Sequence, residues 1–232
     1  MKKTASSFWS SLWQLFFPPL CYSCGWVLQH YENTLCLQCE ISLPESHFAP
    51  DKPNPMQQRL AEHVPVEFAT ALFLFYPQGK IEQLLYQLKY KGQEKLSAYF
   101  GRWAARELPP SLFRQCTAVI PMPLHTKRQH KRGYNQVQGF AEKWATDLGI
   151  PLRNDVVWRK KNTRQLASGK VKNRWEEVQD AFALYPITEM SDNHWLLVDD
   201  VMTSGASLCA CAKTLLQIPR SKISIVTIAY RK

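Results

Sequence analysis

Two adjacent acids at the end of an apolar run are the residues of this sequence best placed to do chemistry. Asp199 and Asp200 lie in LLVDDVMTSGAS, residues 196–207, and hydroxyl-bearing residues and a glycine follow them at once. A strand that turns through such residues into a helix presents backbone N–H groups, hydroxyls and the positive end of the helix dipole, which together bind an anion. The two carboxylates would nevertheless repel a phosphate placed beside them. The stretch therefore predicts a ligand that is neutral and rich in hydroxyls beside the acids and phosphorylated a short distance away.

A ribose 5-phosphate satisfies both demands. We expect Asp199 and Asp200 to accept hydrogen bonds from the 2- and 3-hydroxyls, while the turn from Met202 to Ser207 holds the 5-phosphate. The expected phosphate-binding residues are Thr203, Ser204, Gly205, Ala206 and Ser207. The alternative is that one of the acids merely caps the following helix, but a cap needs only one carboxylate.

Two cysteine pairs near the N-terminus have the spacing of a metal site. Cys21 and Cys24 form one CxxC motif and Cys36 and Cys39 form another, with eleven residues between the pairs. Two such knuckles complete a tetrahedral zinc site, and four protein ligands leave no open position, so we expect structural zinc. Disulfides are the alternative, which a cytoplasmic location disfavours. The remaining cysteines are expected to be small core residues: Cys116, Cys209 and Cys211.

The positive charge of the chain is concentrated in one segment. The net charge is +10, and residues 125–174 hold thirteen Lys or Arg against three acids, which accounts for the whole excess. Such a segment is expected to face a polyanion, either nucleic acid or a multiply phosphorylated small molecule. The alternative is a solvated basic surface that keeps the protein soluble.

After residue 66, runs with strand periodicity alternate with runs with helix periodicity. This alternation predicts an α/β fold with a parallel sheet flanked by helices, in which ligands bind beyond the carboxyl ends of the strands. The expected strands span residues 68–76, 117–120, 155–158, 181–185, 195–198 and 223–230. The expected helices turn these apolar residues inward: Ile81, Leu84, Leu85 and Leu88; Leu96, Tyr99, Phe100 and Trp103; Val137, Phe140, Ala141, Trp144, Ala145 and Leu148; Leu208, Ala212 and Leu215.

The chain is expected to consist of two parts and a connector. Residues 1–45 form an N-terminal helix and the four-cysteine zinc module, the proline-rich residues 46–66 form the connector, and residues 67–232 form the α/β domain. Residues 8–17 are expected to be an amphipathic helix docked on the protein or a partner, with a peripheral membrane role as the alternative. Because no apolar run reaches about eighteen residues, we expect no membrane span and a cytoplasmic location.

Three motifs together resemble a known family. LLVDDVMTSGAS resembles the phosphoribosyl pyrophosphate (PRPP) motif of type I phosphoribosyltransferases. IPMPLHTKRQHKRGYNQ, residues 120–136, resembles the signature of the ComF/GntX family of competence proteins, which also carries N-terminal cysteine knuckles. The resemblance runs from about residue 15 to 230 and implies that residues 67–232 are a phosphoribosyltransferase-like domain that binds PRPP with magnesium.

The resemblance also implies roles for single residues. The loop from Met122 to Leu124 and the cations after it would hold the pyrophosphate, and residues 159–174 would form a mobile loop that closes over the site. Gly133 is expected to adopt a positive φ, and Asn135 either caps the next helix or contacts the ligand. The expected pyrophosphate and loop residues are Pro123, Leu124, Arg128, Lys131, Arg132, Asn135, Gln136, Arg159, Thr163, Gln165 and Arg174.

The family resemblance implies a role in natural transformation, that is, in genetic competence, DNA uptake and the processing of incoming single-stranded DNA. Single-stranded DNA and a competence helicase or another transformation protein are then the expected partners besides PRPP. Two alternatives stay open: an active phosphoribosyltransferase that transfers ribose 5-phosphate to an unknown acceptor, and a PRPP sensor without catalysis. The sequence assigns no catalytic residue.

Overall fold

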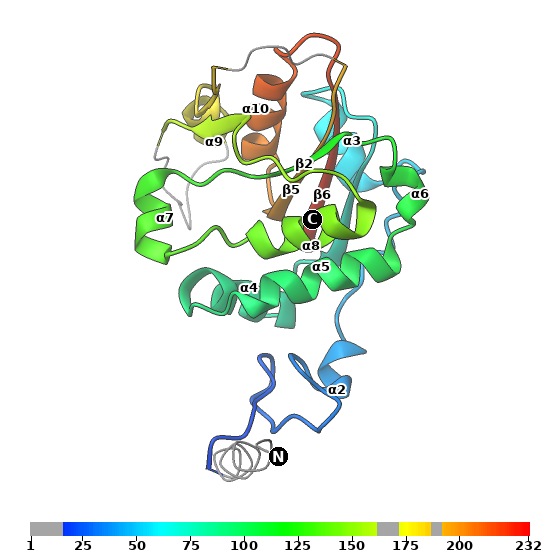
Figure 1. The fold of residues 1–232 in the computed structure, drawn as a ribbon, viewed down its shortest axis with the longest axis vertical. Helices are drawn as coiled ribbons and strands as arrows, with labels where there is room; N and C mark the ends of the chain where they lie inside the picture. The colour runs from blue at the N-terminus through cyan, green and yellow to red at the C-terminus, as the bar shows by residue number, and fades with distance from the viewer. Residues whose placement is uncertain (1–15, 162–171, 187–191) are drawn as a thin grey trace, which may run out of the picture. The chain divides into compact units, whose positions relative to one another are not determined.

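The computed structural model describes residues 16–161, 172–186 and 192–232, and the chain divides into two compact units, Met1–Leu43 and Pro44–Lys232 (Figure 1). The first unit is small, and its described part contains helix α2 (Leu37–Glu40) and a β-bridge between Leu20 and Val27. Most of the predicted helix at residues 8–17 lies outside the described residues. In the described part of the chain, no helix has both the length and the apolar character to cross a membrane.

The second unit is built on a four-stranded parallel sheet, as predicted. Its strands are β1 (Ala69–Leu74), β2 (Ala118–Pro121), β5 (His194–Met202) and β6 (Lys222–Tyr230), in the order β1-β6-β5-β2. All three pairings are parallel, so the carboxyl ends of the strands meet at one edge. Strand β5 pairs with β2 up to Val198 and with β6 as far as Met202, so β6 holds the backbone that carries the acid pair.

Two short strands form a separate sheet. Strands β3 (Val157–Arg159) and β4 (Phe182–Leu184) correspond to the strands expected at 155–158 and 181–185, but they pair with each other in antiparallel fashion. They therefore do not extend the main sheet. Apolar periodicity predicted that these segments are strands, but it contains no information on the partner of a strand.

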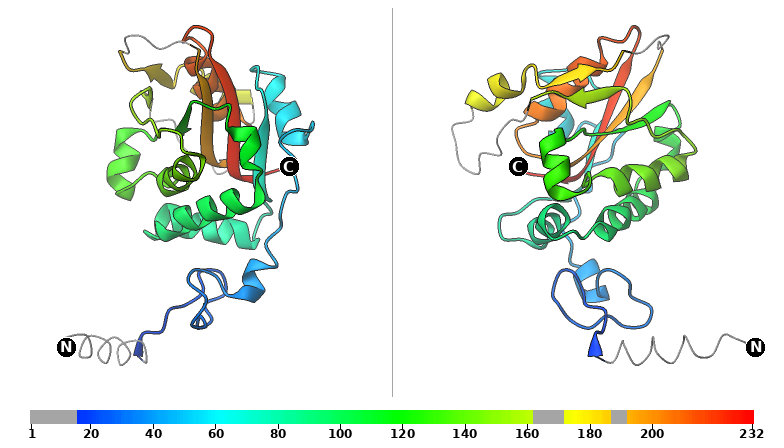
Figure 2. Two further views of the ribbon diagram at one scale, coloured as in Figure 1. Left: turned by 45° about the vertical axis from the view of Figure 1, so that its right-hand side comes forward. Right: turned by 60° about the vertical axis from the view of Figure 1, so that its left-hand side comes forward.

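Helices cover both faces of the main sheet, which is why its strands are apolar on both sides (Figure 2). Helices α4 (Lys80–Tyr90), α5 (Lys95–Glu107) and α8 (Gln138–Leu148) lie on one side, and α10 (Ala206–Leu215) lies on the other. Each inward face that the sequence predicted contributes buried residues to the core. The shorter helices are α3 (Pro55–Ala61), α6 (Pro110–Phe113), α7 (Thr126–Arg132) and α9 (Lys172–Val178).

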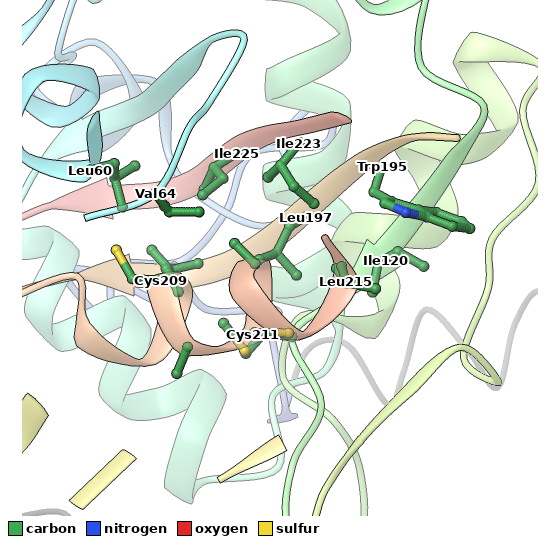
Figure 3. Packing of buried hydrophobic residues seen from close by; sticks show 14 of the residues in the cluster. Leu60, Val64, Ile120, Trp195, Leu197, Cys209, Cys211, Leu215, Ile223 and Ile225 are labelled. Carbon is green, nitrogen blue, oxygen red and sulfur yellow. The ribbon is translucent and has the colours of Figure 1, made fainter. Parts of the chain in front are cut away.

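The core under α10 joins this helix to the sheet (Figure 3). Leu197 and Ile225 of the sheet and Leu215, Cys209 and Cys211 of α10 belong to one cluster, and all five side chains are buried. Cys116 is buried as well, so the interpretation of these three cysteines as core residues is confirmed.

Part of the segment at residues 46–66, expected to be a connector, is packed into the second unit instead. Met56 and Leu60 of α3 are fully buried and belong to the same core cluster as α10. Asn54 caps α3 by accepting a hydrogen bond from the backbone N–H of Gln57 at 3.0 Å, and its amide donates to the carbonyl of Ala69 at 2.8 Å. The prolines of this segment dominated the sequence pattern, but three apolar residues at helical spacing, Met56, Leu60 and Val64, are enough to anchor the helix.

Candidate functional site

A cavity of about 530 Å³ lies in the second unit at the carboxyl end of β5, where parallel sheets bind ligands. It brings together most of the residues that the sequence analysis predicted for ligand binding. Those in its lining are Leu124, Arg128, Arg132, Gln136, Arg159, Asp199, Asp200, Thr203, Ser204, Gly205, Ala206 and Ser207. Residues 70 or more positions apart in sequence thus share one cavity.

Strand β5 runs through the acid pair rather than ending before it. Asp199 pairs with Thr227 of β6, and the pairing continues to Met202 opposite Tyr230. The sequence pattern predicts that the strand ends at Val198, because the apolar run ends there and the acids resemble the start of a turn. Backbone pairing does not depend on side-chain polarity, so the strand extends four residues further and holds both carboxylates in a fixed register.

The two acids of the pair have different surroundings. The Asp200 side chain is 6% exposed; its Oδ1 lies 2.9 Å from the ammonium of Lys89, and its Oδ2 accepts a hydrogen bond from the Gln136 amide at 2.7 Å. Both of its oxygens are therefore engaged by protein groups. Asp199 is partly exposed, and its Oδ1 accepts a hydrogen bond from the backbone N–H of Asp200 at 2.8 Å.

Burial, together with the nearby charge of Asp200, raises the pKa of Asp199 to about 7. The cations Lys89 and Arg159 act in the opposite direction but do not cancel the rise. A carboxyl group with such a pKa is partly protonated at neutral pH, so Asp199 is the member of the pair whose charge is easily changed by a ligand or by pH.

The turn after β5 depends on a glycine with a positive φ. Gly205 has a φ of 81°, and a Cβ at this position would come within 2.9 Å of the terminal methyl of Met202. The hydroxyl of Ser204 accepts a hydrogen bond from the backbone N–H of Ala206 at 3.4 Å. The first N–H groups of α10 have no carbonyl partner four residues earlier in the helix, and they start at this turn.

Arg59 of α3 supports the turn from outside. Its guanidinium donates to the carbonyl of Thr203 at 3.1 Å and to that of Arg231 at 3.4 Å, and it lies over the ring of Tyr230, 5.2 Å from the centroid. The helix in the expected connector therefore fixes the backbone of the predicted phosphate-binding turn. Arg59 lies outside the motifs that predicted the site.

The residues of the signature at 132–136 make two kinds of contact: some connect to the acid pair, and Asn135 bonds to the backbone at the start of the next helix. The Arg132 guanidinium donates to the side-chain oxygen of Gln136, and this amide in turn donates to Asp200, so the signature is connected to the acid pair. Gly133 has a φ of 87°, which confirms the predicted positive φ. Asn135 accepts from the backbone N–H of Val137 at 3.2 Å and donates to the carbonyl of Met122 at 3.0 Å, and these contacts match the capping alternative.

Two further arginines of the cavity have lowered pKa values. For Arg128 the main cause is burial, followed by the charge of Arg132; for Arg159 it is burial, followed by the charge of Arg128. Arg159 is only 8% exposed and lies over the ring of Phe182 at 5.2 Å. Like charges gathered in one place raise the electrostatic energy, and an anion bound among them would lower it.

Not every predicted site residue reaches this cavity. Pro123 and Asn135 line a second cavity of about 840 Å³, which shares Leu124 and Arg159 with the first. Lys131 is exposed and lines neither cavity. Thr163 and Gln165, the side chain of Arg174 and most of the expected mobile loop lie outside the described residues.

The lining also contains residues that the sequence analysis missed: Glu82, Lys89, Tyr90, Glu177 and Arg231. Lys89 and Tyr90 end a helix whose apolar face is formed by Leu84, Leu85 and Leu88. The ring of Tyr90 lies under the guanidinium of Arg132 at 5.6 Å. Lys89 lies beside the apolar face of its helix, which was the available signal for a role in the site. Charged residues at such positions are common on exposed helices, so this signal is weak.

In the first unit, the four cysteines form a cluster. The sulfur atoms of Cys21, Cys24, Cys36 and Cys39 all lie within 4.8 Å of one another, and those of Cys24 and Cys36 are 3.6 Å apart. Thiolates bound tetrahedrally to one zinc ion at about 2.3 Å are roughly 3.8 Å apart, whereas a disulfide needs about 2 Å. The cysteines are unpaired, and their spacing suits one metal ion held by four sulfur atoms.

Asp199 should make the folded protein less stable as the pH rises. Its pKa is about 7 in the fold against an ordinary value of 3.8, so the folded state binds more protons between these pH values. The free energy of unfolding therefore falls as the pH rises through this window. Because Asn cannot titrate, the free energy of unfolding of Asp199→Asn should rise relative to that of the wild type by roughly 1–2 kcal/mol when the pH is raised from 5 to 8. Urea denaturation of both proteins at both pH values measures this difference.

The matched control is Asp51→Asn, which changes an exposed acid outside the cavity and should keep the pH dependence of the wild type. If the stability of Asp199→Asn changes with pH in the same way as that of the wild type, the pKa of this carboxyl is in its ordinary range and the prediction is wrong.

The chain is similar in sequence to competence and DNA utilization proteins of several bacteria. It is 28% identical to Competence protein F of Haemophilus influenzae over 210 residues, which covers 89% of this chain and 82% of that protein. It is 24% identical to DNA utilization protein YhgH of Shigella flexneri over 198 residues, 80% and 79% of the two chains. It is 23% identical to Competence protein ComFC of Bacillus subtilis over 206 residues, 85% and 78% of the two chains.

No protein-family model matches the chain. Among solved structures, adenine phosphoribosyltransferase from Leishmania tarentolae aligns with a TM-score of 0.36 and 9% identity, covering 68% of this chain and 90% of that one, and a TM-score this low does not establish a shared fold. The sequence matches extend over most of the chain, and they make this chain a homologue of Competence protein F, YhgH and ComFC.

Proposed function

We propose that the cavity of the second unit binds the phosphorylated ribose of PRPP, and that the protein uses this site in DNA uptake and utilization. The observation that carries the proposal is the meeting of the acid pair, the glycine turn and a group of cations in one cavity. Each of these elements suits a different part of the ligand. The match between cavity and ligand rests on this chemistry and on the resemblance of the turn to the PRPP motif.

Each part of PRPP has groups in the cavity that can bind it. The 5-phosphate would lie on the backbone N–H groups from Thr203 to Ser207, at the start of α10. A ribose hydroxyl would donate to Asp199, a partly buried residue that lines the cavity. The pyrophosphate would contact the arginines of the lining, because a guanidinium offers several donors to phosphate oxygens at once: Arg128, Arg132 and Arg159.

Magnesium fits this assignment as part of the ligand. Hard divalent cations take oxygen ligands, and PRPP brings its own pyrophosphate oxygens, so the chain needs to supply few or none. When bound, the ion would neutralise part of the pyrophosphate charge.

Transfer of the ribose 5-phosphate is the catalytic alternative. A nucleophile would then displace pyrophosphate from C1 through an oxocarbenium-like transition state. The arginines would stabilise the charge that develops on the leaving pyrophosphate, and the turn and Asp199 would hold the ribose in position. We assign no general base among the described residues of the cavity. The third possibility, a PRPP sensor, uses the same binding groups without this step.

The names of the relatives favour a role in handling DNA. Competence protein F, ComFC and DNA utilization protein YhgH are homologous over most of this chain. We propose the corresponding role here, natural transformation through the processing of incoming single-stranded DNA, with a competence helicase or another transformation protein as partner. The basic segment at residues 125–174 supports contact with nucleic acid, and its cations Lys127, Lys131 and Lys160 are exposed. These partners and the seven cysteines without a disulfide partner suit a cytoplasmic location.

We further propose that the four-cysteine cluster holds structural zinc. Four sulfur ligands suit zinc better than magnesium or calcium, which prefer oxygen. In a unit this small the ion would replace a large apolar core, since its described part buries few apolar side chains: Cys21, Leu28, Leu35, Cys39 and Leu43.

The ligand assignment predicts that PRPP with magnesium binds to the wild-type protein and that Asp199→Ala combined with Asp200→Ala abolishes binding. The double variant removes the hydroxyl acceptor and the partner of Lys89, and isothermal calorimetry measures the outcome. Asp147→Ala combined with Asp155→Ala is the control, because it removes the same number of carboxylates outside the cavity. Unchanged affinity in the first variant would refute the site.

A genetic test separates the DNA role from the binding site. A strain without the gene is expected to lose DNA uptake or processing, and the wild-type gene should restore it. If the variant lacking both acids also restores transformation, the family role stands without any need for PRPP.

The metal assignment predicts about one zinc ion per chain in protein purified without chelator. Replacing Cys36 and Cys39 by serine should remove the zinc and lower the stability of the first unit, because two of four ligands are lost. Elemental analysis measures the ratio, and Cys209→Ser serves as a control because this thiol lies in the α10 core. Wild-type protein without zinc, or with iron in its place, would contradict the assignment.

A further inference from the structure

The ion pair between Lys89 and Asp200 has no role in the site as described so far. The ammonium of Lys89 lies 2.9 Å from the Asp200 carboxylate, and the side chains are only 13% and 6% exposed. Both residues line the cavity. Helix α4 thus places a cation beside the carboxylate that a sequence reading would assign to a ribose hydroxyl.

This ion pair changes the charge that a ligand meets. Two free carboxylates would repel the pyrophosphate on C1, which must lie near the ribose hydroxyls that the acids are expected to bind. At short range in a protein such repulsion is much stronger than in water. With Lys89 against Asp200, the pair of acids and the lysine together carry one negative charge at most.

Lys89 is also connected to the cations expected at the pyrophosphate. Asp200 contacts Lys89 through one oxygen and Gln136 through the other, and Gln136 accepts a hydrogen bond from Arg132. Asp200 is therefore the centre of a network with a cation at each end. Its position suits an organiser of these cations better than a free acceptor, which leaves Asp199 for the ribose hydroxyl.

We propose that Lys89 is a ligand-binding residue that contacts the pyrophosphate on C1 and gives the site its preference for PRPP over ribose 5-phosphate. An ammonium has three N–H donors, and the contact with Asp200 uses one of them. The others are available to a group in the cavity that Lys89 lines. This inference rests on the proposed function, since it names which part of PRPP the residue binds.

A purely structural role for Lys89 predicts a different result. If the lysine only neutralised a buried acid, its loss would disturb Asp199 and the turn as well, and both ligands would bind less tightly. Contact with the pyrophosphate predicts a selective loss, because ribose 5-phosphate carries no group at C1 for Lys89 to hold.

The experiment compares the affinities of PRPP and ribose 5-phosphate, each with the same magnesium concentration, by isothermal calorimetry. For Lys89→Met we expect at least a tenfold loss in PRPP affinity and less than about a threefold loss for ribose 5-phosphate, since tenfold corresponds to one lost interaction of about 1.4 kcal/mol. Lys89→Arg keeps the charge and should recover part of the PRPP affinity. Lys91→Met is the matched control, because Lys91 is exposed and is not part of this cavity.

A second variant covers the case in which Lys89→Met leaves Asp200 buried without a partner and does not fold. Lys89→Met combined with Asp200→Asn removes both charges, and it too should lose the preference for PRPP while ribose 5-phosphate still binds. Equal losses for the two ligands, or an unchanged preference in either variant, would overturn the role of Lys89 and leave the proposed function intact. Wild-type protein that binds neither ligand would overturn both.

Discussion

Strand β5 is hydrogen-bonded to β2 up to Val198 and to β6 as far as Met202, and this pairing sets the positions of the acid pair and of the turn that follows it. The register with β6 holds Asp199 opposite Thr227 and continues to Met202, so the turn begins at a fixed point. A slip of one residue would exchange the faces on which Asp199 and Asp200 lie. The core beneath α10 makes such a slip costly, because it would move Leu197 out of a closely packed cluster.

The electrostatics of the cavity follow from this constraint. Two neighbouring carboxylates held by one strand repel each other, and the fold reduces this repulsion in a different way at each of the two. Asp200 receives Lys89 and Gln136, while Asp199 has a raised pKa. The arginines of the cavity also repel one another, because the charge of Arg132 acts on Arg128 and that of Arg128 acts on Arg159. A ligand with hydroxyls on one side and phosphates on the other would relieve both strains, which is the physical basis of the proposed function.

The local parts of the site could be predicted from the sequence, whereas the long-range parts could not. The acid pair, the glycine turn, Gly133 and the cysteine knuckles are short motifs whose residues lie close in sequence, and the structure brings the predicted residues of each together. Lys89 was missed because its partner is 111 positions away, and a lysine beside the apolar face of a helix such as α4 is common without a binding role. Residues 46–66 were interpreted as a connector because prolines hide the spacing of Met56 and Leu60. The pairing of β3 with β4 was missed because periodicity describes a strand and not its neighbour.

The most direct test of the central claim is a crystal structure of the protein with PRPP and magnesium. The account predicts the 5-phosphate on the backbone N–H groups from Thr203 to Ser207, a ribose hydroxyl on Asp199, and pyrophosphate among the arginines of the lining. It also predicts that Asp200 keeps Lys89 and Gln136 as partners in the complex. Ligand density elsewhere on the protein, or a ribose phosphate bound with its phosphate away from the turn, would contradict the account.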